Sequence, residues 1–206
     1  MSKVDFKKQQ KNLYQPPTSD FVLLEVPAMQ FLMIDGKGDP NKAPAYKAAV
    51  EALYAVSYKL KFMSKQELDK DYTVPPLEGL WWADDMDSFT LNRDKSQWSW
   101  TMMIRVPDWI SADHVDRARK IAGEKKSLPA LSEMRFENYN EGLSVQIMHI
   151  GSYDDEGPIL EKLHDQYIPG QSLGFNGKHH EIYLSDARRV PAEKLKTVLR
   201  QPVRRV

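Results

Sequence analysis

The stretch FLMIDGKGD (Phe31–Asp39) decides the fold, because its pattern returns later in the chain as VQIMHIGSYD (Val145–Asp154). Each stretch is an apolar run of strand-like composition that ends in glycine and then aspartate. We expect a helix that starts at a proline after each stretch. Three pairs of residues keep one offset of 115 positions: Met33/Met148, Gly36/Gly151 and Asp39/Asp154.

A second set of matches supports this repeat. The segments IRVPD (Ile104–Asp108) and IYLSD (Ile182–Asp186) match at an offset of 78 positions, and we expect each to run into a helix. Two ordered sets, each with its own offset, predict a duplicated strand-helix-strand-strand module. The predicted fold class is therefore α+β, with pseudo-twofold symmetry, an antiparallel sheet, helices on one side and a ligand cleft between the repeats.

The expected elements follow from hydrophobic periodicity and turn residues. Residues 1–20 are expected to form a flexible or loosely docked arm, and residues 21–206 a single domain with repeats at about 21–126 and 127–206. A strand is expected to lead into a hairpin turn at residues 140–142. The other predicted strands are residues 21–27, 29–35, 79–85, 98–108, 143–151 and 179–186, and the predicted helices are residues 43–63, 112–126, 158–168 and 191–203.

Composition excludes several classes of function. The 206 residues include 29 Lys and Arg and 29 Asp and Glu, and this zero net charge argues against direct nucleic-acid binding. The absence of Cys removes disulfides and thiolate chemistry. No apolar run is long enough to span a membrane, and the first residues lack the apolar stretch of a signal peptide. We expect a cytoplasmic protein, and a monomer is a simpler expectation than a dimer.

The segment HHEIYLSD (His179–Asp186) contains the first candidate site residue. Alternation places His180, Ile182 and Leu184 on one face, as core packing, and Glu181 and Tyr183 on the other. A carboxylate in a half-buried strand costs free energy unless something offsets its loss of hydration. Glu181 is either solvated, or paired with a cation such as Arg105, or set in a ligand site.

Several segments together resemble the GyrI-like small-molecule-binding proteins, whose superfamily also supplies effector domains of multidrug-responsive bacterial transcription activators. The segments that carry the resemblance are VPPLEGLWW (Val74–Trp82), EGLSVQIMHIGSYDDE (Glu141–Glu156), HHEIYLSDARRVPAEKLKTVLRQPV (His179–Val203) and the helix AYKAAVEALYAVSYKLK. The resemblance implies the duplicated module and an aromatic pocket between its halves, with a buried acid that faces planar, often cationic, aromatic ligands. With only residues 1–20 ahead of the module, the chain looks like a stand-alone member.

The resemblance also implies an activity, because some stand-alone members are described as hydrolases that open the cyclopropane ring of DNA-alkylating natural products. This activity would serve detoxification and needs no cofactor. We assign Glu181 as the general base and Tyr153 as the hydrogen-bond donor to the developing oxyanion. A non-catalytic protein that binds or sequesters planar cationic aromatics, and an interaction module controlled by a small molecule, are the alternatives.

The other candidate ligand-binding residues come from aromatic or polar positions near the same segments. Trp81 and Trp82 are adjacent, so in a strand they point to opposite faces, and at most one lines a given face. Tyr153 and His149 are open to a structural reading as well, as a helix-entry anchor and a strand residue. The full predicted ligand-binding set is Glu78, Trp81, Trp82, Met103, Arg105, Trp109, Tyr183 and His149.

No metal or nucleotide cofactor is expected. His179 and His180 are adjacent in a strand and face apart, so they cannot readily chelate one ion. Gly36-Lys37-Gly38 follows a strand but lacks both the dinucleotide fingerprint and the P-loop pattern.

Overall fold

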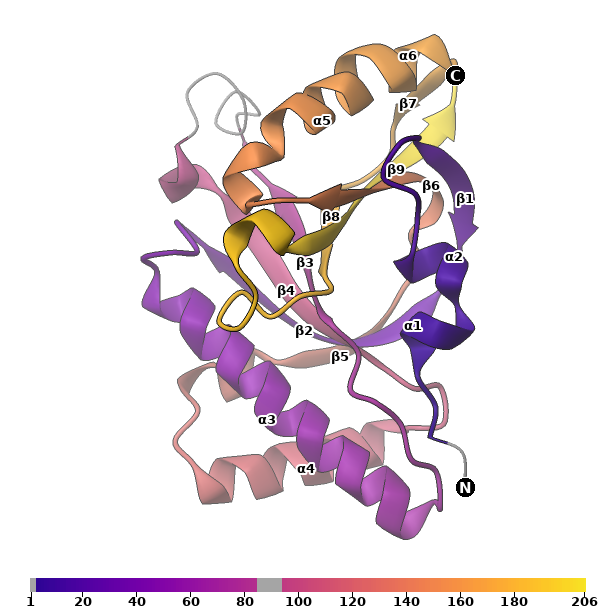
Figure 1. Cartoon of the computed structure of the whole chain (residues 1–206). Helices are drawn as coiled ribbons and strands as arrows, with labels where there is room; N and C mark the ends of the chain where they lie inside the picture. Colours follow the sequence, from indigo (N-terminus) through magenta and orange to yellow (C-terminus); the bar gives the residue numbers. More distant parts are fainter. Residues whose placement is uncertain (1–2, 85–93) are drawn as a thin grey trace. The chain divides into compact units, whose positions relative to one another are not determined.

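The computed structural model describes residues 3–84 and 94–206, and the chain divides into two compact units. Unit 1 comprises Met1–Gln9 and Met29–Tyr139, and unit 2 comprises Gln10–Ala28 and Asn140–Val206. Figure 1 shows the elements of both units. The last residue of the strand predicted at 79–85 lies outside the described residues.

Unit 1 is built on four antiparallel strands in the order β3-β4-β2-β5. The strands are β2 (Met29–Lys37), β3 (Leu77–Trp82), β4 (Ser99–Val106) and β5 (Arg135–Tyr139). The helical elements are α1 (Phe6–Gln9), α3 (Pro44–Glu67), η2 (Lys95–Gln97), α4 (Ala112–Lys125) and η3 (Pro129–Glu133). In Figure 1, α4 lies beside α3, and α3 also packs against β2 and β4.

The two long helices of unit 1 form where the sequence predicts them. Pro44 occupies the first turn of α3, where its missing N–H costs nothing, and Leu53, Val56 and Leu60 repeat at helical spacing and are buried. At the start of α4 the Ser111 side chain accepts from the backbone N–H of His114, while the His114 ring accepts from the Ser111 backbone N–H. Both helix predictions are confirmed.

Gly36 lies under the indole of Trp100, its partner across β2 and β4. A Cβ at position 36 would stand 2.1 Å from Trp100 Cη2, and the Trp100 indole N–H donates to the Gly38 carbonyl at 3.2 Å. The ring is fully buried, so it has little room to move. This part of unit 1 therefore requires a glycine.

Gly36→Ala is expected to lower the free energy of unfolding by about 2–3 kcal/mol, because the added methyl overpacks the core against Trp100. Urea unfolding followed by tryptophan fluorescence measures this loss. Gly157→Ala is the matched control, since at this helix position the added methyl meets no described atom within 4 Å beyond the adjoining residues and the helix's own backbone, and the variant should be neutral or slightly more stable. Equal stability of the two variants would contradict the packing argument.

Unit 2 has four antiparallel strands in the order β8-β9-β6-β1, and a short strand, β7, also pairs with β9. The strands are β1 (Val22–Val26), β6 (Gly142–Ile150), β7 (Leu173–Phe175), β8 (His179–Tyr183) and β9 (Lys196–Arg205). The helical elements are α2 (Lys11–Tyr14), η4 (Tyr153–Asp155), α5 (Gly157–Glu161), the π-helical η5 (Lys162–Tyr167), α6 (Ile168–Gly170) and η6 (Ala192–Lys194).

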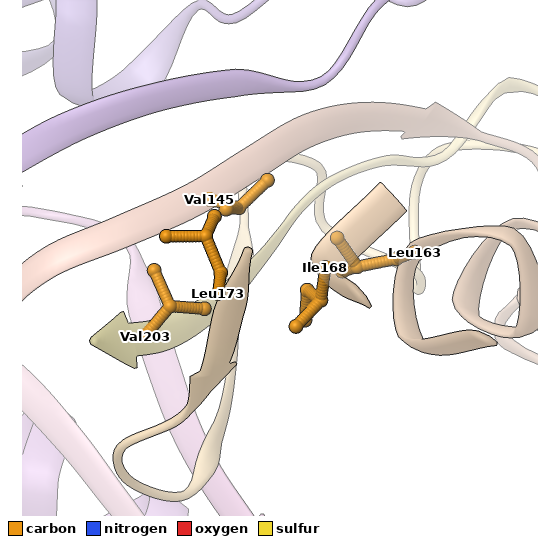
Figure 2. Close-up of a cluster of buried hydrophobic side chains, with 5 residues drawn as sticks. All are labelled: Val145, Leu163, Ile168, Leu173 and Val203. Carbon is orange, nitrogen blue, oxygen red and sulfur yellow. The ribbon is translucent and has the colours of Figure 1, made fainter. Parts of the chain in front are cut away.

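A cluster of five buried side chains joins the helical segment of unit 2 to its strands (Figure 2). Leu163 from η5 and Ile168 from α6 pack toward the sheet, so one face of β6 and β9 is covered by the α5-η5-α6 segment. The other members are Val145, Leu173 and Val203.

Two sequence predictions in unit 2 are wrong. Residues 191–203 were expected to form a helix, but only η6 is helical, and β9 begins at Lys196 and pairs with β6 on one side and β8 on the other. The predicted hairpin turn at residues 140–142 does not join paired strands, because β5 pairs with β2 whereas β6 pairs with β1 and β9. The positive φ of Gly142 reflects a change of direction that the glycine permits.

The α+β class with antiparallel pairing is confirmed, and the duplication itself stays a prediction. The orders β3-β4-β2-β5 and β8-β9-β6-β1 place β8 where unit 1 has β3 and β9 where it has β4. The 78-position match therefore pairs Ile104 of β4 with Ile182 of β8, and these two strands occupy different positions in the strand orders of their units. Residues 3–20 contain the short helices α1 and α2, and Phe6, Leu13 and Tyr14 are buried. The repeat boundaries stay a prediction.

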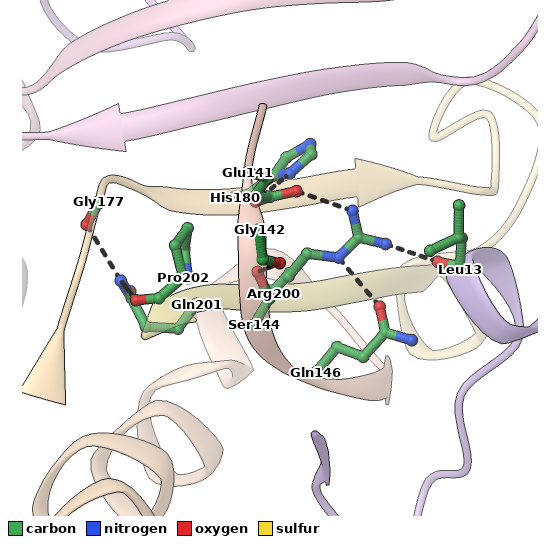
Figure 3. Close-up of polar contacts among 10 residues, drawn as sticks. All are labelled: Leu13, Glu141, Gly142, Ser144, Gln146, Gly177, His180, Arg200, Gln201 and Pro202. Carbon is green, nitrogen blue, oxygen red and sulfur yellow. Dashed lines mark hydrogen bonds and ion pairs between the residues drawn. The ribbon is translucent and has the colours of Figure 1, made fainter. Parts of the chain in front are cut away.

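The face of β8 opposite Glu181 contains a buried ionic network, shown in Figure 3. Arg200 Nη1 donates to Glu141 Oε2 at 3.0 Å, Nη2 to the Leu13 carbonyl at 2.8 Å and Nε to Gln146 Oε1 at 3.0 Å. His180 Nδ1 lies 2.8 Å from Glu141 Oε1. Burial by itself raises the pKa of Glu141, but the neighbouring His180 and Arg200 outweigh it and lower this pKa to about 2. His180 is thus part of this network, where the sequence predicted ordinary core packing.

Candidate functional site

The strand β8 places three polar side chains in a row on one face: His179, Glu181 and Tyr183. The Glu181 side chain keeps only 14% of its surface exposed, which excludes the reading of a solvated surface carboxylate. The face belongs to the side of unit 2 that the α5-η5-α6 segment covers, because the His164 ring of η5 lies edge-on against the His179 ring. The predicted alternation of β8 is confirmed.

Both carboxylate oxygens of Glu181 have a neighbour from the same strand. The Tyr183 hydroxyl donates to Oε2 at 2.7 Å, and His179 Nε2 lies 3.4 Å from Oε1. The Tyr183 hydrogen bond holds one oxygen of the carboxylate, while His179 lies near the other oxygen without a hydrogen bond to it. A base held in this way can accept a proton from a bound molecule or pair with its positive charge.

Tyr153 joins this site from the turn that follows β6. Its ring meets the Tyr183 ring edge-on at a centroid distance of 5.6 Å, and 36% of its surface is exposed. The turn is held by His149, whose Nε2 lies 3.0 Å from the Ser152 carbonyl oxygen. Gly151 in this turn has a φ of 151°, and an added Cβ would meet the His149 ring at 3.0 Å. His149 therefore positions the turn that carries Tyr153.

Three residues of this site were missed by the sequence predictions: His164, His179 and Thr197. Burial, followed by the neighbouring His179, lowers the pKa of His164 to about 4, so its imidazole is neutral at pH 7. Thr197 lies on β9 opposite both Tyr183 and His149, and it is fully buried. Thr197 was missed because residues 191–203 were wrongly predicted to form a helix.

Unit 1 contains the remaining candidates, and Glu78, Met103 and Arg105 share one buried face of its sheet. Glu78 stands opposite Met103 on β3 and β4, and Arg105 follows two residues after Met103. The guanidinium carbon of Arg105 lies 4.1 Å from the centroid of the Phe6 ring. This face combines a carboxylate, a thioether and a guanidinium inside unit 1.

The three candidate tryptophans have different surroundings. Trp81 is buried and packs against Tyr46 of α3 and Trp98, whereas Trp82, the next residue along β3, is half-buried. Trp109 packs against Phe6 and Tyr72, and its indole N–H donates to Ser64 Oγ at 2.9 Å. Trp81 and Trp109 therefore contribute to the packing of unit 1.

The predicted site residues thus divide between the units. Within unit 2 the structure brings together Glu181, Tyr183, Tyr153 and His149, and within unit 1 it brings together Glu78, Met103 and Arg105. Across residues 3–84 and 94–206, no group of three or more His, Cys, Asp or Glu side chains could hold a metal ion. No helix in the described part of the chain is long and apolar enough to cross a membrane.

Comparisons with known proteins agree with this fold. Residues 19–204 match the family model of the GyrI-like small molecule binding domain. An uncharacterized conserved protein from Listeria innocua is 40% identical, with a TM-score of 0.89, over 98% of this chain and 100% of that one. A hydrolase from Listeria innocua is 38% identical, with a TM-score of 0.86 and the same coverage. None of the curated proteins compared with the chain matches it.

A more distant structure shows the same fold alone. The C-terminal domain of EcmrR is 12% identical, with a TM-score of 0.57, over 91% of this chain and 98% of that one.

Proposed function

Because the chain belongs to the family of GyrI-like small-molecule-binding domains, we propose that it binds planar cationic aromatic compounds and hydrolyses the cyclopropane ring of planar DNA-alkylating natural products. The family match confirms the resemblance stated from the sequence. The observation that carries the proposal is the shielded carboxylate of Glu181, with Tyr183 and His179 at its two oxygens. The likeness to a Listeria innocua hydrolase at 38% identity supports the enzymatic part.

Binding follows from the cost of a shielded carboxylate. Moving Glu181 out of water costs free energy that a cation can offset, and the partly exposed Tyr153 ring offers an aromatic contact. The Tyr183 hydroxyl keeps the carboxylate in place before the ligand arrives. A planar aromatic cation meets both requirements of this site.

Hydrolysis uses the same carboxylate as a general base. Glu181 takes a proton from a water molecule, the water oxygen bonds to a cyclopropane carbon, and the ring C–C bond breaks. Its electron pair moves through the conjugated dienone to the carbonyl oxygen, which becomes a phenolate. Tyr183 holds the base, and the Tyr153 hydroxyl donates to the developing oxyanion. The proton on Glu181 then returns to solvent or to the phenolate, which restores the carboxylate.

Planar cations should bind in the micromolar range, on the order of −7 to −8 kcal/mol. Glu181→Gln is expected to weaken the binding of proflavine by roughly tenfold or more, because a hydrogen bond or ion pair to a charged group is lost. A neutral diaminoanthracene of the same shape should lose much less. Fluorescence titration of both compounds against both proteins measures the difference.

Glu161→Gln provides the control for this experiment, because Glu161 is an exposed carboxylate on α5 of the same unit. It removes the same charge without touching the site, so proflavine affinity should stay close to that of the wild type. Equal losses for the cation and the neutral compound in Glu181→Gln would remove Glu181 from the ligand-binding site.

A further inference from the structure

Further polar residues adjoin both ends of the row His179, Glu181 and Tyr183 on β8. The Cα atoms of alternate strand residues are about 6–7 Å apart, and from these positions the His179 and Tyr183 side chains approach Glu181 from opposite sides. Thr197 extends the Tyr183 end across to β9, and His164 of η5 adjoins the His179 end. Polar groups therefore lie on both sides of the central carboxylate.

Several of these polar atoms are buried and have no hydrogen-bond partner among residues 3–84 and 94–206. They are Thr197 Oγ1 at one end, and His179 Nδ1 and His164 Nε2 at the other. Buried polar atoms in native proteins nearly always have partners, and each exception calls for an explanation. Here such unpartnered atoms lie at both ends of one row, on either side of the Glu181 carboxylate. Their grouping indicates that they serve binding and not the packing of the protein itself.

Thr197 is the clearest example of a buried polar group that packing does not require. Valine has nearly the same shape as threonine, favours strands equally well and would bring no hydroxyl into the buried site. By contrast, the buried Thr101 of unit 1 donates its hydroxyl to Asp35 Oδ1 at 2.5 Å. The packing of unit 2 alone gives no reason for the Thr197 hydroxyl.

We propose that the two ends of this row recognise hydrogen-bonding groups on either side of the ligand centre that meets Glu181. The ligand class is then a planar aromatic compound with amino, hydroxyl or amide groups flanking its cationic or electrophilic centre on each side. This inference rests on the proposed function and narrows its substrate class. Thr197 and His164 are specificity-determining residues, and fully alkylated cations are poor ligands.

Two dyes of equal charge test the proposal. Proflavine is an acridinium cation with an amino group on each outer ring, and acridine orange is the same cation with both amino groups dimethylated, so that they cannot donate. Wild-type protein should prefer proflavine. Thr197→Val should weaken proflavine binding by roughly three- to tenfold and leave acridine orange unchanged, because one hydrogen bond is lost. His164→Leu, of similar volume, should act in the same way at the other end.

Thermal unfolding of the ligand-free variants gives a second readout. Thr197→Val should raise the Tm, because it removes a buried hydroxyl without a partner, whereas the matched Thr101→Val should lower it by leaving Asp35 without that hydrogen bond. A lower Tm for Thr197→Val, or unchanged proflavine affinity, would overturn the proposal.

The outcomes also separate this inference from the proposed function. If both dyes bind equally and Glu181→Gln weakens both, the proposed function stands and this inference fails. If neither dye binds, both fail.

Discussion

Glu181→Gln is expected to lower the turnover of a cyclopropane-containing alkylator by at least roughly a hundredfold, because removal of a general base typically costs about 10² to 10⁴ in rate. The amide keeps the size of the carboxylate and can still contact Tyr183, so the variant should fold and bind substrate. Mass spectrometry of the ring-opened product over time gives the rate, and circular dichroism checks the fold. The loss should appear in kcat more than in KM.

Two comparisons sharpen this prediction. Glu161→Gln, which changes an exposed carboxylate of the same unit, should keep the wild-type rate. Tyr183→Phe should lose part of the rate, because the carboxylate loses its hydrogen-bond donor but stays a base. If Glu181→Gln turns substrate over at nearly the wild-type rate, Glu181 is an electrostatic anchor for the ligand and not a base. If the wild type binds the compound without converting it, the protein is a binder and not a hydrolase.

The sequence predicts most of unit 1 because its local signals agree with the final packing. The first long helix has a proline in its first turn and buried residues at helical spacing, and the strand of Trp100 alternates strictly between two faces. Residues 191–203 show the opposite case. Pro191 and the following AEKLK are typical of a helix start, yet pairing of β9 with both β6 and β8 overrides this local preference.

The candidate site also contains some features that local sequence patterns predict and others that depend on tertiary contacts. Alternation alone places Glu181 and Tyr183 on one face, and the structure confirms it with a hydrogen bond between them. The other face of β8 was misread because the partners of His180 come from distant segments, Glu141 and, through Arg200, Leu13. Such partners become neighbours only through tertiary structure, so no local pattern in the sequence reports them. His164 was missed for the same reason.

Arg200→Met is expected to lower the free energy of unfolding at pH 7 by about 3–5 kcal/mol, the largest stability effect we predict. The substitution leaves the buried Glu141 carboxylate with His180 alone, and it removes the partners of Gln146 Oε1 and of the Leu13 carbonyl. Urea unfolding measures the loss. Arg204→Met on the same strand is the control, because Arg204 is exposed and its replacement should change stability by less than about 0.5 kcal/mol.

The pH dependence tests whether the Glu141 charge causes this loss. The pKa of Glu141 in the folded protein, about 2, lies below its ordinary value of 4.5, so its ionised form stabilises the fold fully above pH 4.5 and loses that effect as the pH falls toward 2. Without Arg200, burial raises this pKa, and Glu141 takes up its proton at a higher pH. The stability difference between wild type and Arg200→Met should therefore shrink as the pH falls from about 5 toward 2, the pKa of Glu141 in the folded wild type. A difference that stays constant over this range would mean that Arg200 stabilises unit 2 through packing and its neutral hydrogen bonds, and not through the charge of Glu141.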